Sequence, residues 1–223
     1  VPVPQLVAPR AQWWRRGWLL QETAEGERLI DCRGFLSNAE EVTLFRNFGR
    51  TVATMHNITA EEATAAGLTV AHPQSWNTVH MSWIRERLAV LEGTPAFGEI
   101  VEECEQWFLD RHETLFASDV VFRLLHLDLN QRNVFATPDG LTGQPTVSAI
   151  IDWDEVCFGH SEEELMRTEC ASFSFDGSEL DALLRRSFFE GYSSVLPLDE
   201  GYEQRRPFYY LSRLLVHCGC MIE

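Results

Sequence analysis

The polar residues with the clearest chemical pattern lie in the middle of the chain, between residues 126 and 152. Residues 126–133 (HLDLNQRN) have the spacing H-x-D-x-x-x-x-N, and Asp152 follows an apolar run. Phosphoryl transfer needs a carboxylate that orients the attacking hydroxyl, and oxygen ligands that hold Mg²⁺ against the triphosphate. The pattern therefore predicts a phosphotransfer centre formed by Asp128, Asn133 and Asp152.

The same three residues have a structural interpretation. Asp128 and Asn133 could be turn residues, and Asp152 could cap the end of a strand. The spacing alone is only suggestive, but its surroundings add weight. The loop follows a strand-like run and precedes a hairpin-like pair that ends in the acid, which is the order that kinase chemistry requires.

Short strands and long helices must position these groups. Hydrophobic periodicity predicts the first helix at 39–55, preceded by a capping box that Ser37 and Glu40 would form. The last helical stretch should be broken or kinked by Pro207. The remaining elements are expected helices at 76–91, 97–116 and from 178 onward, and expected strands at 18–22, 120–125, 133–136 and 147–151, with a turn at 137–140.

The charge balance restricts the partners. The net charge is −16, and all 18 basic residues are arginines. Such a chain would repel nucleic acids and anionic membranes, and it would attract cationic small molecules. No apolar run is long enough for a transmembrane helix, and the six cysteines are scattered without a zinc-binding pattern. We therefore expect a cytoplasmic protein with a small-molecule substrate, and the sequence leaves its oligomeric state open.

These motifs resemble the aminoglycoside phosphotransferase and choline kinase group, especially its fungal members. The resemblance rests on residues 126–135, 144–154 and 49–56. Residues 18–29 resemble the hinge strand of that family and the turn after it. Together these stretches occur in the family's order over most of residues 1–160, and the remainder has the general character of its helical region.

The resemblance implies ATP and Mg²⁺ as cofactors and a role for each matching residue. Asp154 would support the metal site or face the substrate, and the helices around 76–116 and 160–223 would bind the acceptor. The other implied roles are catalytic base for Asp128, brace of the catalytic loop for His126, Mg²⁺ ligands for Asn133 and Asp152, and adenine contacts for the backbone of Gln21, Glu22 and Thr23.

The implied fold is α+β and protein-kinase-like. It would be a mostly helical C-lobe with a short β-hairpin region that carries the catalytic loop. Residues 1–30 would be a hinge and a remnant of the N-lobe, and residues 31–223 would form the helical C-lobe.

The chain departs from the family pattern at its start. Only about 17 residues precede the expected hinge strand, and they hold no Gly-rich phosphate loop. The chain contains no Lys to grip the phosphates, and Arg is not equivalent to Lys at such a site. Either the sequence is part of a longer ATP-dependent small-molecule kinase, which the missing initiator Met favours, or the protein is a repurposed, non-phosphorylating binder or cyclase. A regulatory pseudokinase is a third alternative, less favoured because the metal ligands persist.

Overall fold

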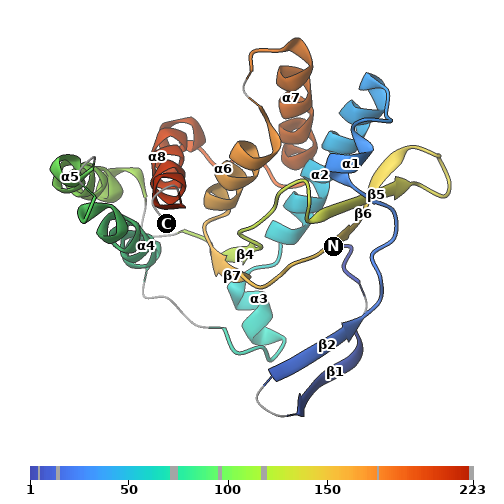
Figure 1. Ribbon diagram of the computed structural model, residues 1–223, viewed down its shortest axis with the longest axis horizontal. Helices are drawn as coiled ribbons and strands as arrows, with labels where there is room; N and C mark the ends of the chain where they lie inside the picture. Colours follow the sequence, from blue (N-terminus) through green and yellow to red (C-terminus); the bar gives the residue numbers. More distant parts are fainter. Residues whose placement is uncertain are drawn as a thin grey trace. The chain divides into compact units, whose positions relative to one another are not determined.

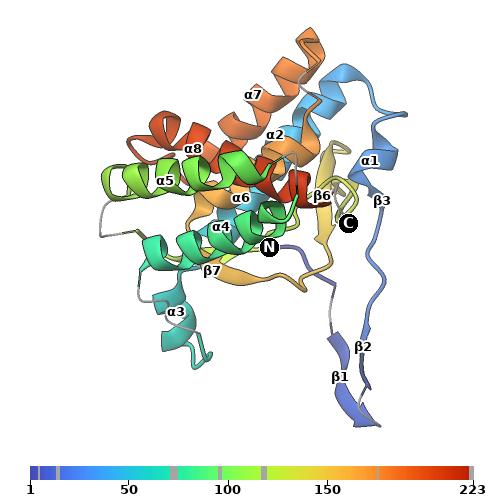
Figure 2. The ribbon, with the colours of Figure 1, turned by 60° about the vertical axis from the view of Figure 1, so that its left-hand side comes forward.

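The computed structural model describes residues 1–4, 6–13, 16–70, 75–94, 97–116, 120–174 and 176–220. The chain forms two compact units (Figures 1 and 2). We call them the first unit, which comprises residues 1–57, 126–156 and 168–197, and the second unit, which comprises residues 58–125, 157–167 and 198–223.

Two antiparallel helices form the core of the first unit, α2 (Asn38–His56) and α7 (Glu179–Ser193). They lie side by side in both views (Figures 1 and 2), and they touch at two glycines. A Cβ atom on Gly49 would lie 2.0 Å from the carbonyl oxygen of Phe188, and one on Gly191 would lie 2.0 Å from that of Arg46. Only glycine therefore permits this approach. The contact buries Phe45, Phe48, Val52, Leu184 and Phe188.

A three-stranded antiparallel sheet in the order β3-β5-β6 completes the first unit, with strands β3 (Glu27–Arg28), β5 (Val134–Pro138) and β6 (Pro145–Ile150). The β5–β6 register pairs Val134 with Ile150, and the buried positions alternate along β5. The inner face therefore packs on α2. A separate hairpin precedes the sheet, formed by β1 (Leu6–Trp13) and β2 (Arg16–Gln21), and the short helix α1 (Leu29–Cys32) follows β3.

The second unit is mainly helical. Its helices are α3 (Ala60–Ala65), α4 (Trp76–Glu92), α5 (Gly98–Leu115) and α8 (Tyr202–Cys220). A two-stranded ladder pairs β4 (Arg123–Leu125) with β7 (Cys157–Gly159). Helix α6 (Ser161–Ser172) begins in the second unit, and its last residues belong to the first.

Charged and polar groups are buried inside the second unit. Glu163 is 1% exposed, accepts a hydrogen bond from Arg167 at 2.9 Å, and lies 3.6 Å from His80 Nε2. Burial alone would raise the pKa of Glu163, but the contact with His80 and the charge of Arg167 hold it well below its usual value. His112 is also buried, and among the described residues neither of its ring nitrogens has a hydrogen-bond partner. Burial lowers the pKa of His112 to about 4.

Most of the predicted elements are confirmed. The capping box of Ser37 and Glu40 is present at the start of α2, and Ser178 caps α7. The strand expected at 120–125 is shorter, because only Arg123–Leu125 pair with β7. Strand β2 covers residues 18–21 of the strand expected at 18–22, and the side chains of residues 18–20 lie outside the described part of the chain.

The break expected at Pro207 is wrong, since α8 continues through it. Proline in a helix interior costs about 3 kcal/mol. This loss is offset because the turn that follows buries Phe208 and Tyr209 almost completely.

The division into a remnant at residues 1–30 and a lobe at 31–223 stays a prediction. No described helix is long and apolar enough to cross a membrane.

Candidate active site

The two segments that carry the predicted site have unusual backbone conformations. Leu127 has φ 65° and Asp152 has φ 66°, and they are the only non-glycine residues with positive φ in the described part of the chain. This left-handed region is costly for most side chains, and such residues cluster at active sites. Leu127 is buried, and its turn separates His126 from Asp128. The conformation is therefore imposed by packing around the loop.

His126 connects the loop to the segment that leads to Asp152. Its Nδ1 accepts a hydrogen bond from the backbone N–H of Asp128 at 3.3 Å, and its Nε2 lies 2.8 Å from the carbonyl oxygen of Ile151. Because a carbonyl only accepts, Nε2 carries the proton and the ring is neutral. The ring is fully buried and packs against Trp153, with centroids 4.6 Å apart. His126 therefore connects the two segments through its two ring nitrogens, and its role in catalysis stays a prediction.

Asp128 is held by two asparagine side chains. Asn133 Nδ2 donates to Asp128 Oδ2 at 2.8 Å, and Asn130 Nδ2 donates to Oδ1 at 3.1 Å. Both amides also donate to the backbone carbonyl of Asp128, at 3.0 Å and 3.2 Å respectively. These bonds fix the carboxylate in one orientation while the residue keeps partial exposure. A hydroxyl group can therefore approach an oriented carboxylate.

Asn133 is hydrogen-bonded to the residue that precedes Asp152. The backbone N–H of Ile151 donates to the carbonyl oxygen of Asn133 at 3.0 Å, so Asp152 follows directly on the residue bonded to Asn133. The amide nitrogen of Asn133 is used by Asp128, so its oxygen is the atom that can bind a cation. Asp152 is exposed. An amide oxygen and a carboxylate are hard ligands, and this donor set fits Mg²⁺.

The predicted adenine contacts lie elsewhere in the first unit. Gln21 is the last residue of β2, and Glu22 and Thr23 follow it in an irregular segment. All three are exposed, as is Asp154. Their proposed roles stay predictions.

Sequence reasoning missed Asn130 and Leu127. The spacing pattern treats both as variable positions, yet one binds Asp128 and the other makes the left-handed turn. An Asx pattern was available as a signal, because Asn130 Oδ1 accepts from the backbone N–H of Arg132 at 2.9 Å.

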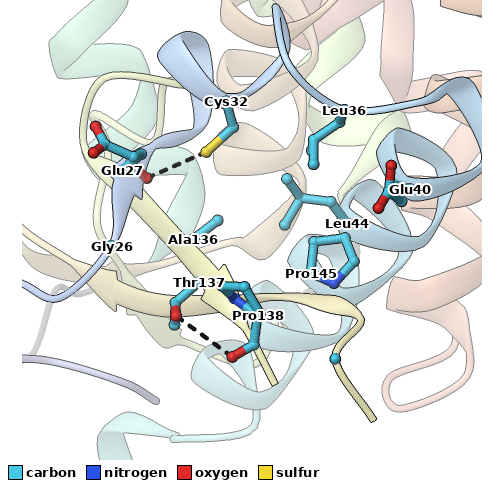
Figure 3. A pocket seen from close by; sticks show the side chains of 11 residues that line it. Gly26, Glu27, Cys32, Leu36, Glu40, Leu44, Ala136, Thr137, Pro138 and Pro145 are labelled. Atoms are coloured by element: carbon cyan, nitrogen blue, oxygen red, sulfur yellow. Dashed lines mark hydrogen bonds between the residues drawn. The ribbon is translucent and has the colours of Figure 1, made fainter. Parts of the chain in front are cut away.

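The first unit also contains a pocket of about 210 Å³ that none of the predicted site residues lines (Figure 3). Its wall is mostly apolar, with Leu36, Leu44, Ala136 and Pro145 around the thiol of Cys32. Burial, together with the nearby Glu27 and Asp31, raises the pKa of Cys32, so its thiol is a weak nucleophile.

The catalytic loop, the acid after β6 and the mixed architecture define a kinase-like phosphotransferase fold. Residues 1–208 match the profile of the Phosphotransferase enzyme family (APH), and the chain belongs to that family.

Three relatives illustrate the similarity. A probable ketoamine kinase of Enterococcus faecium is 27% identical over 137 residues, which are 56% of this chain and 43% of that protein. A second relative is an aminoglycoside phosphotransferase from Streptomyces rimosus, whose structure is in complex with ADP and streptomycin. Its TM-score is 0.63 at 18% identity, and the match covers 96% of this chain and 75% of that chain. An amicoumacin kinase in complex with AMP-PNP and Ca²⁺ has a TM-score of 0.61 at 18% identity and covers 91% of this chain and 56% of its own. The chain thus spans less than half the length of the curated relative.

Proposed function

We propose that this chain carries the catalytic part of an ATP- and Mg²⁺-dependent kinase that phosphorylates a hydroxyl group of a small molecule. The observation that carries the proposal is the pair of amide hydrogen bonds from Asn133 and Asn130 to the carboxylate of Asp128. A structural turn residue needs only one such bond, whereas a group that must orient a nucleophile needs a fixed direction.

Each residue of the site has a part in the reaction. Asp128 would accept a hydrogen bond from the acceptor hydroxyl, orient its oxygen toward the γ-phosphorus, and take its proton. Asn133 and Asp152 would hold Mg²⁺, which neutralises charge on the phosphates when bound. His126 keeps the two segments at a fixed separation by bonding to Asp128 and Ile151.

The relatives support the choice of cosubstrate and acceptor class. Structural neighbours are in complex with adenine nucleotides, with Ca²⁺ in one case and an aminoglycoside in another. The net charge of −16 favours a cationic acceptor, and it disfavours nucleic acid as a partner. We also infer a cytoplasmic location, where ATP is available. We also propose that the backbone of Gln21, Glu22 and Thr23 contacts the adenine. The similarity to fungal members of the family is likewise part of this proposal.

A second function is favoured by one observation, the absence of Lys from all 223 residues. A chain without a phosphate-gripping Lys could use the same loop to bind a small molecule without phosphorylating it. Under this alternative Asp128, held by Asn130 and Asn133, would orient a ligand, and ATP would not bind.

A thermal-shift titration separates the two. With Mg²⁺ present, ATP should raise the unfolding temperature of the chain, since a ligand that binds only the folded state stabilises it. The variant Asp152→Asn should lose the Mg²⁺-dependent part of that shift. No shift at millimolar ATP would eliminate the kinase proposal for this chain and favour the non-phosphorylating alternative.

A further inference from the structure

Three side chains of types that bind metals converge within the second unit. One ligand atom each from His160, Glu162 and Asp199 lies within 4.8 Å of the other two. His160 Nε2 is 4.0 Å from Glu162 Oε1 and 4.0 Å from Asp199 Oδ2. His160 follows β7, Glu162 is in the first turn of α6, and Asp199 precedes α8. The group therefore joins two segments that are distant in the sequence.

The cluster shares no residue with the predicted phosphotransfer site, whose members Asp128, Asn133 and Asp152 belong to the first unit. His160 directly follows Gly159, which pairs with Arg123 at the end of the β4–β7 ladder.

Two of the three side chains are fixed by packing and the third is free to adjust. His160 is 5% exposed and Glu162 is 3% exposed, whereas the Asp199 side chain is 66% exposed. The second ring nitrogen of His160 is 2.6 Å from the hydroxyl of Tyr209, and Trp76 Nε1 donates to the same hydroxyl at 2.9 Å. Metal-binding histidines usually donate their second N–H to an acceptor, so Nδ1 of His160 must carry the proton and donate to this hydroxyl when Nε2 binds the metal.

We propose that His160, Glu162 and Asp199 form a binding site for a divalent transition metal of the Zn²⁺ class. One imidazole nitrogen and two carboxylates match the ligands that Zn²⁺ accepts, whereas Mg²⁺ prefers oxygen alone. Bonds of about 2.0–2.1 Å in a tetrahedral site place the ligand atoms roughly 3.3 Å apart. The observed separations are wider. Rotation of the exposed Asp199 side chain closes its distance to His160, whereas His160 Nε2 and Glu162 Oε1, 4.0 Å apart, must move together by about 0.7 Å when the metal binds.

Arg205 limits the strength of this site. It donates to both oxygens of Glu162, at 2.8 Å and 2.5 Å, and to the backbone carbonyl of Glu200 at 3.0 Å. The Arg205 guanidinium therefore orients the Glu162 carboxylate. It also competes with a metal ion for the negative charge of that carboxylate. Each carboxylate oxygen has a second lone pair, so both partners can bind at once. The affinity should accordingly be lower than that of a dedicated structural zinc site.

A cavity of about 280 Å³ adjoins the cluster and gives it a fourth coordination position. His160, Asp199 and Arg205 line the cavity beside the apolar side chains of Phe116 and Val120. Three protein ligands and an open position reached from a cavity are the arrangement of zinc sites that bind a water molecule or a small ligand. In this chain the metal would tie the segment before α8 to the start of α6.

The test uses the metal alone, added to the full chain in high salt so that diffuse attraction to the acidic surface is screened. Calorimetry with Zn²⁺ should show one site, and excess Mg²⁺ should not compete for it. Co²⁺ should give visible absorption without a thiolate charge-transfer band, which excludes the cysteines as ligands. Asp199→Asn should weaken binding by at least about tenfold, and Asp199→Cys should restore or strengthen it with a thiolate signature.

Glu200→Gln is the matched control, because it removes the same charge one residue away and lines the same cavity. This variant should keep the affinity for Zn²⁺ within about twofold of the wild-type value, because an exposed charge that does not bind the metal contributes little. Equal weakening by Glu200→Gln and Asp199→Asn would overturn the proposal in favour of diffuse acidic attraction. Loss of Zn²⁺ binding in Asp152→Asn would place the ion in the phosphotransfer loop and overturn it too, as would no binding at all. The outcome does not depend on whether the chain binds ATP.

Discussion

Asn133 donates its side-chain amide to Asp128 Oδ2 at 2.8 Å, and this one hydrogen bond determines the role of both residues. It orients the carboxylate that would activate the acceptor. Because the nitrogen is used, it also assigns the amide oxygen of Asn133 to cation binding. The proposed base and the proposed metal ligand are therefore joined by a hydrogen bond, and a change in either residue should disturb the other.

Asp128→Asn should abolish phosphoryl transfer, with a loss of about 1–2 kcal/mol in stability. The amide oxygen of the new side chain can still accept from Asn133, but its NH₂ group then faces the amide of Asn130, and that hydrogen bond is lost. The new side chain also cannot take a proton from the acceptor. Loss of a general base reduces kcat by about 10²–10⁴-fold. Steady-state kinetics measure this loss, with Glu61→Gln as a control at an exposed acid that has no assigned role. Equal loss in both variants would contradict the assignment of Asp128.

Asn133→Asp should make the stability of the chain depend on pH. The substitution places two carboxyl groups at hydrogen-bond distance, so the pKa of the pair should rise above that of an unfolded carboxyl. A raised carboxyl pKa means that stability is lost as pH rises through it and returns at acid pH. Denaturant titrations at pH 4.5 and pH 7.5 should differ by about 1–2 kcal/mol relative to wild type.

Asn133→Ala is the control for that experiment, since it removes the hydrogen bond without adding a charge. It should be destabilised to a similar degree at both pH values. Mg²⁺ should reduce the destabilisation of Asn133→Asp but not that of Asn133→Ala. The same pH profile in the two variants would show that charge repulsion is not the cause.

His126→Ala should damage both stability and catalysis. It leaves the backbone N–H of Asp128 and the carbonyl of Ile151 without the partner that joins them, and each lost buried bond costs about 1–3 kcal/mol. If His126 positions Asp128, kcat should fall while the KM for ATP changes little. A fall in stability with unchanged kcat would reduce His126 to a packing role.

His112→Leu should stabilise the chain, and more so in mild acid. The substitution removes a buried ring whose nitrogens have no hydrogen-bond partner among the described residues. With a folded pKa of about 4 against 6.5 for the free side chain, the wild type keeps its full stability above pH 6.5. The free energy of unfolding of the wild type then falls by up to about 3 kcal/mol as pH falls toward 4. Urea titrations between pH 7 and pH 4.5 should show a shallower fall in the variant.

His217→Gln is the comparison for His112, because His217 belongs to the same unit but is exposed. Its replacement should change the pH dependence much less. An identical acid profile for wild type and His112→Leu would show that other groups dominate the acid response.

The features that depend on local sequence could be predicted, and those set by distant contacts could not. The capping box of Ser37 and Glu40 and the polar residues after β4 and β6 are encoded within a few positions. The orientation of Asp128 is different, since it depends on Asn130, a position that the spacing pattern leaves variable. The strand pairing of Glu27 with Ala136 connects residues more than 100 positions apart, which no local pattern reports.

The prediction at Pro207 failed for a related reason. Local propensity gives the cost of proline in a helix but not the burial that offsets it. Phe208 and Tyr209 pack inside the second unit, and this gain is known only from the tertiary structure. The cluster at His160 also escaped the sequence, because Asp199 joins it from a segment almost 40 positions away.

The paired glycines of α2 and α7 have a consequence for protein engineering. Replacement of helical glycines by alanine is a standard way to gain stability, worth about 1 kcal/mol at an open site. At Gly49 and Gly191 the added methyl group would collide with a carbonyl oxygen of the opposite helix. A stabilisation campaign guided by helix propensity would therefore choose two of the least tolerant positions in this chain, and libraries for improved variants should keep both glycines fixed.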